Sequence, residues 1–240
     1  MTAIKFSLNL ILSVMLCLAI NVHAQDYLEE QQATAPSIDE LKKQLESDIS
    51  NEDYRLQLYY AYIQKGKKAD AAQILETGLR HSPDSFKYHF ELCPLYLEIN
   101  QTNKAIYHAQ KAVAIEPDNA MAVYNLGLAY GSAGLHQNAI EVFKRAIALD
   151  SSKPDFYFDT GVACFNLSYY QEAIAYYEKT LELDPQEARA YFNLGTVYNI
   201  MNQKDKAVSY LQKALDILGP FTEEGQKTIG FIEEIRKKDY

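Results

Sequence analysis

Residues 120–153 read AMAVYNLGLAYGSAGLHQNAIEVFKRAIALDSSK, and this stretch decides the fold of the chain. Its apolar residues recur at steps of three and four on both sides of Gly134, which predicts two amphipathic helices joined by a tight turn. The same pattern returns every 34 residues, five times between Glu52 and Phe221, without an insertion. A fixed period of this length is typical of stacked helical hairpins rather than of one globular core.

Small residues recur at fixed positions of this period, where two helices must approach each other closely. The eighth position is glycine in three of the five repeats. The twentieth position is alanine in every repeat: Ala71, Ala105, Ala139, Ala173 and Ala207. Because each hairpin leaves one apolar face uncovered, only stacking of neighbouring repeats buries that face.

These residues resemble the tetratricopeptide repeat (TPR) family, whose unit follows the pattern W-x-x-L-G-x-x-Y, then A, F, A and P. A close match is Phe192-Asn193-Leu194-Gly195, followed by Tyr198, Ala207 and Ala214. The resemblance covers about 170 of the 240 residues. It implies an all-α, right-handed TPR solenoid of five helix-turn-helix repeats. The family tryptophan is replaced here at every repeat, by Arg55, His89, Val123, Tyr157 and Tyr191.

The rest of the chain is assigned around the repeats. Ser37-Ile38-Asp39-Glu40 is a capping box, which predicts a helix start, and an isoleucine stripe between Thr222 and Lys238 predicts a final helix. The expected organisation is a signal peptide (1–24), a linker (25–36), an N-terminal capping helix (37–51), repeats 52–85, 86–119, 120–153, 154–187 and 188–221, and a C-terminal capping helix (222–240).

The first 24 residues have the pattern of an export signal. One basic residue, Lys5, precedes an apolar run from Phe6 to Ile20, and small residues at positions 22 and 24 predict cleavage before Gln25. The sequence therefore predicts an exported protein of the periplasm or cell envelope. An uncleaved N-terminal anchor is the alternative.

Charge and motifs exclude several classes of function. The formal net charge of −9 lacks the basic footprint of a nucleic-acid-binding protein. Among the histidines of the repeats only His89 has a His or Cys three or four residues away, namely Cys93, and both Cys93 and Cys164 fall at packing positions. No phosphate-binding loop or nucleophile motif is present. We therefore assign no enzymatic activity, cofactor, metal or small-molecule substrate.

Recognition is expected on the concave face, which the resemblance assigns to the first helix of each repeat. Its fifth and sixth positions pair an apolar, mostly aromatic residue with an amide or a carboxylate. Asn can donate to and accept from a peptide backbone, and the carboxylates favour a partner with basic residues. The aromatic residues have packing as an alternative role. The candidate peptide-binding residues are Phe90, Glu91, Tyr124, Asn125, Phe158, Asp159, Phe192 and Asn193.

The sequence thus predicts a non-enzymatic scaffold or adaptor that binds a protein or an extended peptide. Two alternatives stay open. The chain is a subunit of an envelope assembly, of secretion or pilus type, that docks by its ends or convex face, or it is a scaffold that self-associates. The oligomeric state does not follow from the sequence.

Overall fold

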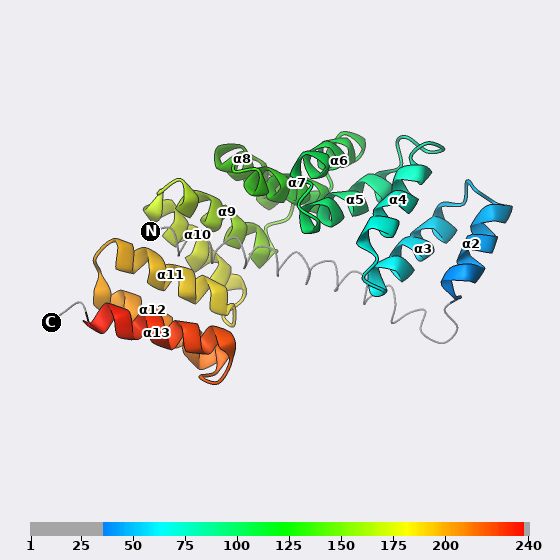
Figure 1. Cartoon of the computed structure of the whole chain (residues 1–240). Coiled ribbons are helices and arrows are strands. Elements are labelled where there is room, and N and C mark those ends of the chain that lie inside the picture. The colour runs from blue at the N-terminus through cyan, green and yellow to red at the C-terminus, as the bar shows by residue number, and fades with distance from the viewer. Residues whose placement is uncertain (1–35, 238–240) are drawn as a thin grey trace. The chain divides into compact units, whose positions relative to one another are not determined.

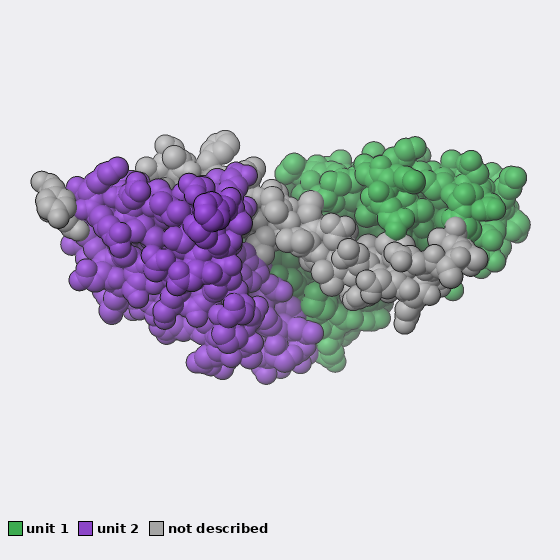
Figure 2. All heavy atoms as spheres, turned by 90° about the horizontal axis from the view of Figure 1, so that it is seen from below, with its two compact units in different colours: residues 1–133 green, residues 134–240 purple. Residues whose placement is uncertain are grey.

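The computed structural model describes residues 36–237, which form twelve α-helices and no strand, so the predicted all-α class is confirmed. These residues fall into two compact units, unit 1 ending at Ala133 and unit 2 beginning at Gly134 (Figure 1, Figure 2). The predicted signal peptide and all but the last residue of the predicted linker lie outside the described residues. None of the helices between residues 36 and 237 is long and apolar enough to cross a membrane.

In each unit every helix packs against the next one along the chain. Unit 1 contains α2 (Ile38–Ser47), α3 (Glu52–Gln64), α4 (Lys68–Gly78), α5 (Phe86–Glu98), α6 (Thr102–Ile115) and α7 (Ala120–Ser132). Unit 2 contains α8 (His136–Leu149), α9 (Pro154–Asn166), α10 (Tyr170–Leu183), α11 (Ala188–Ile200), α12 (Lys204–Leu218) and α13 (Glu223–Lys237). The first helices α3, α5, α7, α9 and α11 begin 34 residues apart, and the second helices α4, α6, α8, α10 and α12 keep the same interval.

The turn inside each repeat has a left-handed residue at one fixed position. A positive φ between 58° and 75° occurs at Gly66, Asn100, Gly134, Ser168 and Asn202. Glycine adopts this conformation without steric cost and asparagine tolerates it, whereas Ser168 is unusual there. The backbone therefore repeats its turn geometry even where the residue type changes.

Helix starts follow the capping chemistry of their sequences. The capping box at Ser37 and Glu40 is confirmed, because each side chain accepts from the backbone N–H of the other residue. Asn51, Ser85 and Asn119 each accept from an amide three residues later, at the starts of α3, α5 and α7. These bonds satisfy amides that the first helical turn leaves without a partner.

The small residues that the sequence places at fixed positions of the period are buried. All five alanines at position 20 are fully buried. A Cβ on Gly161 would lie 2.6 Å from the Tyr177 ring, and one on Gly195 would lie 2.6 Å from Leu211 Cγ. Cys93 and Cys164 are also buried, as expected of small packing residues.

Helices outside the five repeats lie at the two ends of the described chain. The helix α2 packs on α3 and buries Leu41 and Leu45, while α13 packs on α12 and buries Ile232 and Ile235. These contacts bury the apolar stripes that the sequence places on both helices.

Three of the five residues at the position of the family tryptophan bond to the turn that precedes their helix. Arg55 Nη2 donates to the carbonyl of Ile49 at 2.5 Å, and Tyr157 OH donates to that of Ser151 at 3.2 Å. His89 Nε2 lies 3.0 Å from the carbonyl of Pro83. In each case the carbonyl is six residues earlier, so a polar tip replaces the lost tryptophan by securing the connection between repeats.

Candidate functional site

Burial divides the eight predicted peptide-binding residues into two groups. Tyr124, Asn125 and Phe158 are at most 8% exposed, so their side chains belong mainly to the packing of their units. The other five are half-buried and lie at the edge of the packed interior: Phe90, Glu91, Asp159, Phe192 and Asn193.

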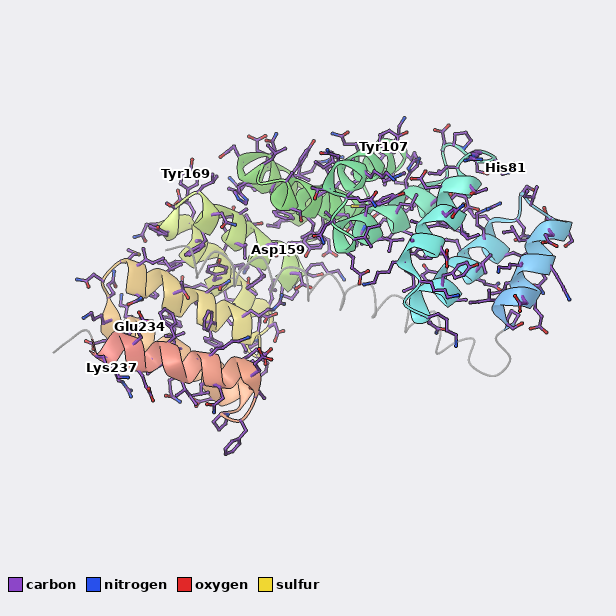
Figure 3. All side chains as sticks on the ribbon, viewed as in Figure 1. His81, Tyr107, Asp159, Tyr169, Glu234 and Lys237 are labelled. Carbon is purple, nitrogen blue, oxygen red and sulfur yellow. The ribbon has the colours of Figure 1, made fainter. Side chains whose placement is uncertain are left out.

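In unit 2, polar groups from three successive helices converge on one place. Asp159 lies on α9 (Figure 3), Tyr177 on α10 and Asn193 on α11. The Tyr177 side chain is fully buried, and among residues 36–237 its hydroxyl makes no hydrogen bond of good geometry. Burial raises the pKa of this hydroxyl well above its usual value and the Asp159 charge raises it further, while the Asn193 amide opposes the rise. Both predicted residues thus lie close to a buried and incompletely bonded hydroxyl.

An arginine occupies the space beside Phe158. The guanidinium of Arg189 lies 4.4 Å from the centre of the Phe158 ring and 3.2 Å from Asp155 Oδ1. Glu187 also pairs with it. The positive charge covers one face of the ring and links α9 to α11, so Phe158 supports the surface instead of offering its ring to a partner.

Phe192 and Phe90 have aromatic neighbours within their own units. The Phe192 ring lies 5.9 Å from that of Phe231 on α13, and the Phe90 ring stacks on Phe86 at 5.4 Å. These contacts hold the half-buried rings in place, which lowers the entropy cost of presenting them to a partner.

Glu91 is held by a bond inside unit 1. Its Oε1 accepts from Tyr60 OH at 2.6 Å, and its backbone carbonyl accepts from Tyr59 OH at 3.4 Å. The carboxylate is therefore oriented by α3, the first helix of the preceding repeat.

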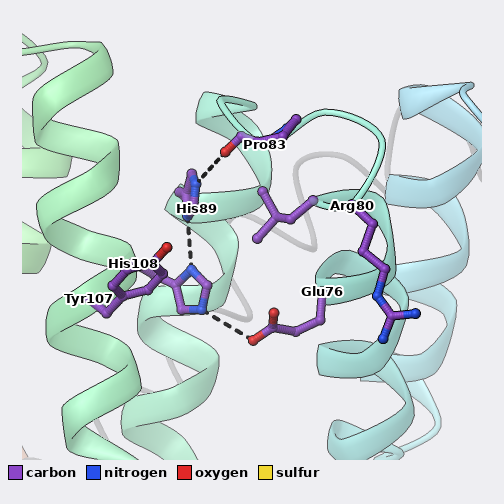
Figure 4. Close-up of a pocket in the computed structure, with 7 residues that line it drawn as sticks. Glu76, Arg80, Pro83, His89, Tyr107 and His108 are labelled. Atoms are coloured by element: carbon purple, nitrogen blue, oxygen red, sulfur yellow. Dashed lines mark hydrogen bonds and ion pairs between the residues drawn. The ribbon is translucent and has the colours of Figure 1, made fainter.

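A second polar cluster, not predicted from the sequence, lines a cavity of about 280 Å³ in unit 1 (Figure 4). His89 on α5 and His108 on α6 are both 2% exposed, and their Nδ1 atoms lie 2.9 Å apart. His108 Nε2 lies 3.3 Å from Glu76 Oε1 on α4, and the same oxygen accepts from Tyr96 OH at 2.6 Å. Arg80, Pro83 and Tyr107 complete the polar and aromatic parts of the lining.

This cluster was missed because the two histidines are nineteen residues apart. A spacing of three or four finds ligands on one helix, whereas positions 4 and 23 of a repeat face each other across two helices. The 34-residue period could have revealed the pair, because positions 4 and 23 come together in more than one repeat. In the last repeat these positions hold Tyr191 and Tyr210, whose rings lie 6.4 Å apart.

Two family models match parts of the chain. Residues 161–218 match a tetratricopeptide repeat model, and residues 98–180 match the model described as subunit 3 of the anaphase-promoting complex, cyclosome. No curated protein matches the chain at a significant level.

Solved structures share the fold. The crystal structure of MamA is 31% identical, with a TM-score of 0.63, and the match covers 67% of this chain and 94% of MamA. YrrB, described as a TPR protein with an unusual peptide-binding site, is 20% identical with a TM-score of 0.62, over 77% of this chain and 93% of its own. PilW, described as a widely conserved type IV pilus biogenesis factor, is 19% identical with a TM-score of 0.67, over 78% of this chain and 92% of its own.

Proposed function

The chain belongs to the tetratricopeptide repeat family, and from this premise we propose that it is a scaffold that binds an extended, basic segment of a protein partner. The observation that carries the proposal is the convergence of Asp159, Tyr177 and Asn193 in unit 2. Within unit 2 the proposed surface consists of Asp159, Phe192 and Asn193, with the buried Phe158 beneath it, and unit 1 by itself offers Phe90 and Glu91, with the buried Tyr124 and Asn125 in the packing behind them.

The Tyr177 hydroxyl supports a binding role because its position is costly without a partner. A buried polar group that lacks a hydrogen bond costs about 1–3 kcal/mol. An extended peptide carries alternating backbone donors and acceptors, which can pair with the half-buried Asn193 amide that lies against this hydroxyl. A phenylalanine would fill the same space without the cost, which supports a role for the hydroxyl in holding the Asn193 amide toward a partner.

Local charge favours a basic segment. On the surface of unit 2 three acids act on Arg189, namely Asp155, Asp159 and Glu187. The whole chain has a formal net charge of −9. A Lys or Arg side chain beside Asp159 is attracted by this field, mainly at low salt.

The experiment compares Tyr177→Phe with wild type on an immobilised array of synthetic peptides that differ in Lys and Arg content. Wild type is expected to bind the basic peptides best. Tyr177→Phe is expected to weaken binding at least threefold while its thermal unfolding temperature stays equal or rises. Asn193→Ala is expected to weaken binding further.

Tyr169→Phe is the matched control, because Tyr169 is an exposed tyrosine of the same unit. It should leave binding unchanged. The proposal fails if Tyr177→Phe and Asn193→Ala both bind the array as wild type does, or if acidic and basic peptides bind equally well.

A second candidate function is a subunit of an envelope assembly, which the likeness to PilW favours. Such a subunit would work in an exported compartment and would dock by the ends or the outer helices. Sedimentation of the chain over a range of concentrations separates this role from self-association, since a stable monomer is incompatible with a self-associating scaffold. Docking through the ends predicts that Asn193→Ala leaves assembly intact.

A further inference from the structure

We propose that a surface of tyrosines and lysines on α11 and α12 of unit 2 binds an extended, acidic segment of a protein partner. These two helices pack against each other near the C-terminal end of the described chain (Figure 1). The tyrosine–lysine surface is formed by Tyr191 and Tyr198 on α11 and by Lys206, Tyr210 and Lys213 on α12.

This surface lies on a different side of α11 from the residues proposed to bind a basic segment. Tyr191 and Tyr198 are seven residues apart, which places both on one side of a helix with 3.6 residues per turn. Asn193 follows Tyr191 by two residues and therefore points to the opposite side, where it contacts Tyr177 of α10. The inference goes beyond the proposed function and does not rest on it.

The three tyrosine rings form a row. The Tyr198 ring lies 5.3 Å from the Tyr210 ring, with 8° between their planes, and the Tyr210 ring lies 6.4 Å from that of Tyr191. Tyr191 and Tyr210 are half-buried, and Tyr198 is buried beside them. Because each ring is held by the next, a partner that contacts the row does not have to order it.

Earlier tyrosines at the repeat position of Tyr198 use their hydroxyls inside the protein. In unit 1, Tyr96 OH donates to Glu76 Oε1 at 2.6 Å, and Tyr130 OH accepts from Gln110 Nε2 at 3.1 Å. In both cases the partner stands at position 25 of the preceding repeat. The repeat thus has a standard internal partner for this hydroxyl.

The hydroxyls of the row in unit 2 have no such partner. Glu178 stands at position 25 of the preceding repeat, yet Tyr198 does not bond to it. Across residues 36–237, Tyr191 and Tyr210 also make no hydrogen bond through their hydroxyls. Burial raises the pKa of both Tyr198 and Tyr210, and the Glu178 charge adds to the rise. These two phenols therefore stay protonated and can donate to a partner.

Two exposed lysines lie over the faces of the same rings. Lys206 Nζ is 5.0 Å from the centre of the Tyr198 ring. Lys213 Nζ is 5.6 Å from the centre of the Tyr191 ring and 5.4 Å from that of Tyr210. In the part of the chain that the structure describes, neither ammonium group pairs with a carboxylate.

The chemistry of these groups selects an acidic partner. Ammonium groups only donate hydrogen bonds, and a protonated phenol donates one. The tyrosine–lysine surface therefore presents several donors without an internal acceptor. A carboxylate is the side chain that accepts from such donors most strongly, because the hydrogen bonds are charge-assisted.

The spacing of the two lysines indicates how the carboxylates must be arranged. Lys206 and Lys213 are seven residues apart on α12, or about 10.5 Å along the helix axis. A single carboxylate is too short to reach both. In a polyproline II segment, residues three apart lie on the same side and about 9.3 Å from each other. Surfaces lined by aromatic residues commonly bind segments in this conformation.

The net charge of the whole chain favours a short acidic segment over a long polyanion. With a formal net charge of −9, the chain repels nucleic acid and anionic membranes at long range. A segment with two carboxylates meets mainly the local lysines, because salt screens the more distant charges. Exposed ion pairs contribute little individually, so binding is expected to be weak and sensitive to salt.

The test is an NMR titration of the protein with the blocked peptide Pro-Glu-Pro-Pro-Glu-Pro and, separately, with the same peptide carrying glutamine in place of both glutamates. The acidic peptide is expected to bind at least fivefold more tightly and to shift resonances of α11 and α12. Lys206→Gln/Lys213→Gln should weaken its binding at least threefold without a change in fold, because both side chains are exposed.

The matched control is Lys104→Gln/Lys111→Gln, which changes the same two repeat positions in unit 1. There Lys104 donates to the Tyr96 hydroxyl at 3.5 Å, and that hydroxyl donates to Glu76, so the donors already have internal partners. This variant should bind the acidic peptide as wild type does.

Three results would overturn the proposal. The glutamine peptide could bind as tightly as the acidic one, Lys206→Gln/Lys213→Gln could bind as wild type does, or vesicles of phosphatidylglycerol could bind more tightly than the peptide. Tyr177→Phe should leave binding of the acidic peptide unchanged, so a failure here is separate from a failure of the proposed basic-peptide surface.

Discussion

The same three positions of the repeat hold different rings in the two units. Unit 1 has His89, Tyr96 and His108, and unit 2 has Tyr191, Tyr198 and Tyr210 three periods later. The stacking is nearly identical: Tyr96 lies on His108 at 5.4 Å and 14°, and Tyr198 lies on Tyr210 at 5.3 Å and 8°.

The charges around the two trios also correspond. Lys104 lies over the Tyr96 ring at 4.7 Å, and its counterpart Lys206 lies over Tyr198 at 5.0 Å. Glu76 has its counterpart in Glu178, which acts on the pKa of both Tyr198 and Tyr210. The backbone and the charges are thus shared, and the chemistry differs because two imidazoles form a buried hydrogen-bonded chain that two phenol rings do not.

The largest expected effect compares the same new residue, phenylalanine, at one repeat position in both units. His89→Phe removes the partners of the Pro83 carbonyl and of His108 Nδ1, and each buried unsatisfied group costs about 1–3 kcal/mol. We therefore expect unit 1 to lose about 3 kcal/mol of stability. Tyr191→Phe keeps its ring and should change unit 2 by less than about 0.5 kcal/mol. Hydrogen exchange in α5 and α11 reports the two units separately.

A smaller effect tests how the first repeat accommodates Arg55. An added Cβ at Gly78 would lie 2.4 Å from Arg55 Cδ and 2.6 Å from the Tyr88 ring. Gly78→Ala should destabilise unit 1 by about 2 kcal/mol through overpacking, although alanine fills the same position at Ala112 and Ala214. Combining it with Arg55→Val should cost less than the sum of the two single changes, measured by urea unfolding. Strict additivity would show that the clash is not with Arg55.

The smallest effect concerns the turns. Ser168 has a φ of 63°, whereas Gly66 occupies the same position in unit 1. A non-glycine residue in the left-handed conformation costs about 1–2 kcal/mol of folding free energy. Glycine avoids this cost, but its larger loss of backbone entropy on folding offsets about 0.5–1 kcal/mol of the benefit. Ser168→Gly should therefore raise the stability of unit 2 by about 0.5 kcal/mol, and Gly66→Ser should lower that of unit 1 similarly. Thermal unfolding of the pair measures both signs.

Much of the fold could be predicted because the period fixes which residues must be small. The alanines at position 20 and the capping box at Ser37 are local features, and the structure has them where the sequence indicates. The turns could be predicted only in part. Gly134 indicates a turn by its residue type, whereas Ser168 and Asn202 adopt the same left-handed conformation because the helices on both sides impose it.

The candidate sites were harder to predict because residues at the same position of different repeats differ in burial. Phe158 and Phe192 share a position, yet Phe158 is buried beside Arg189 while Phe192 is half-buried against α13. In the sequence, Arg55 is a departure from the family pattern. In the structure its side chain is buried, and its guanidinium donates to the backbone carbonyls of Ile49 and Ile74. Such roles depend on neighbours in other repeats, which a single position does not reveal.

The left-handed residue at the same place in successive turns also bears on how the chain can be recombined. If the chain were cut after Gly66 and rejoined at Gln101, one whole repeat would be lost, and the new junction would join equivalent turns with the same backbone conformation. The helices on either side would keep their phase. Each turn is therefore a natural crossover point at which this chain gains or loses a repeat without a change in helix geometry.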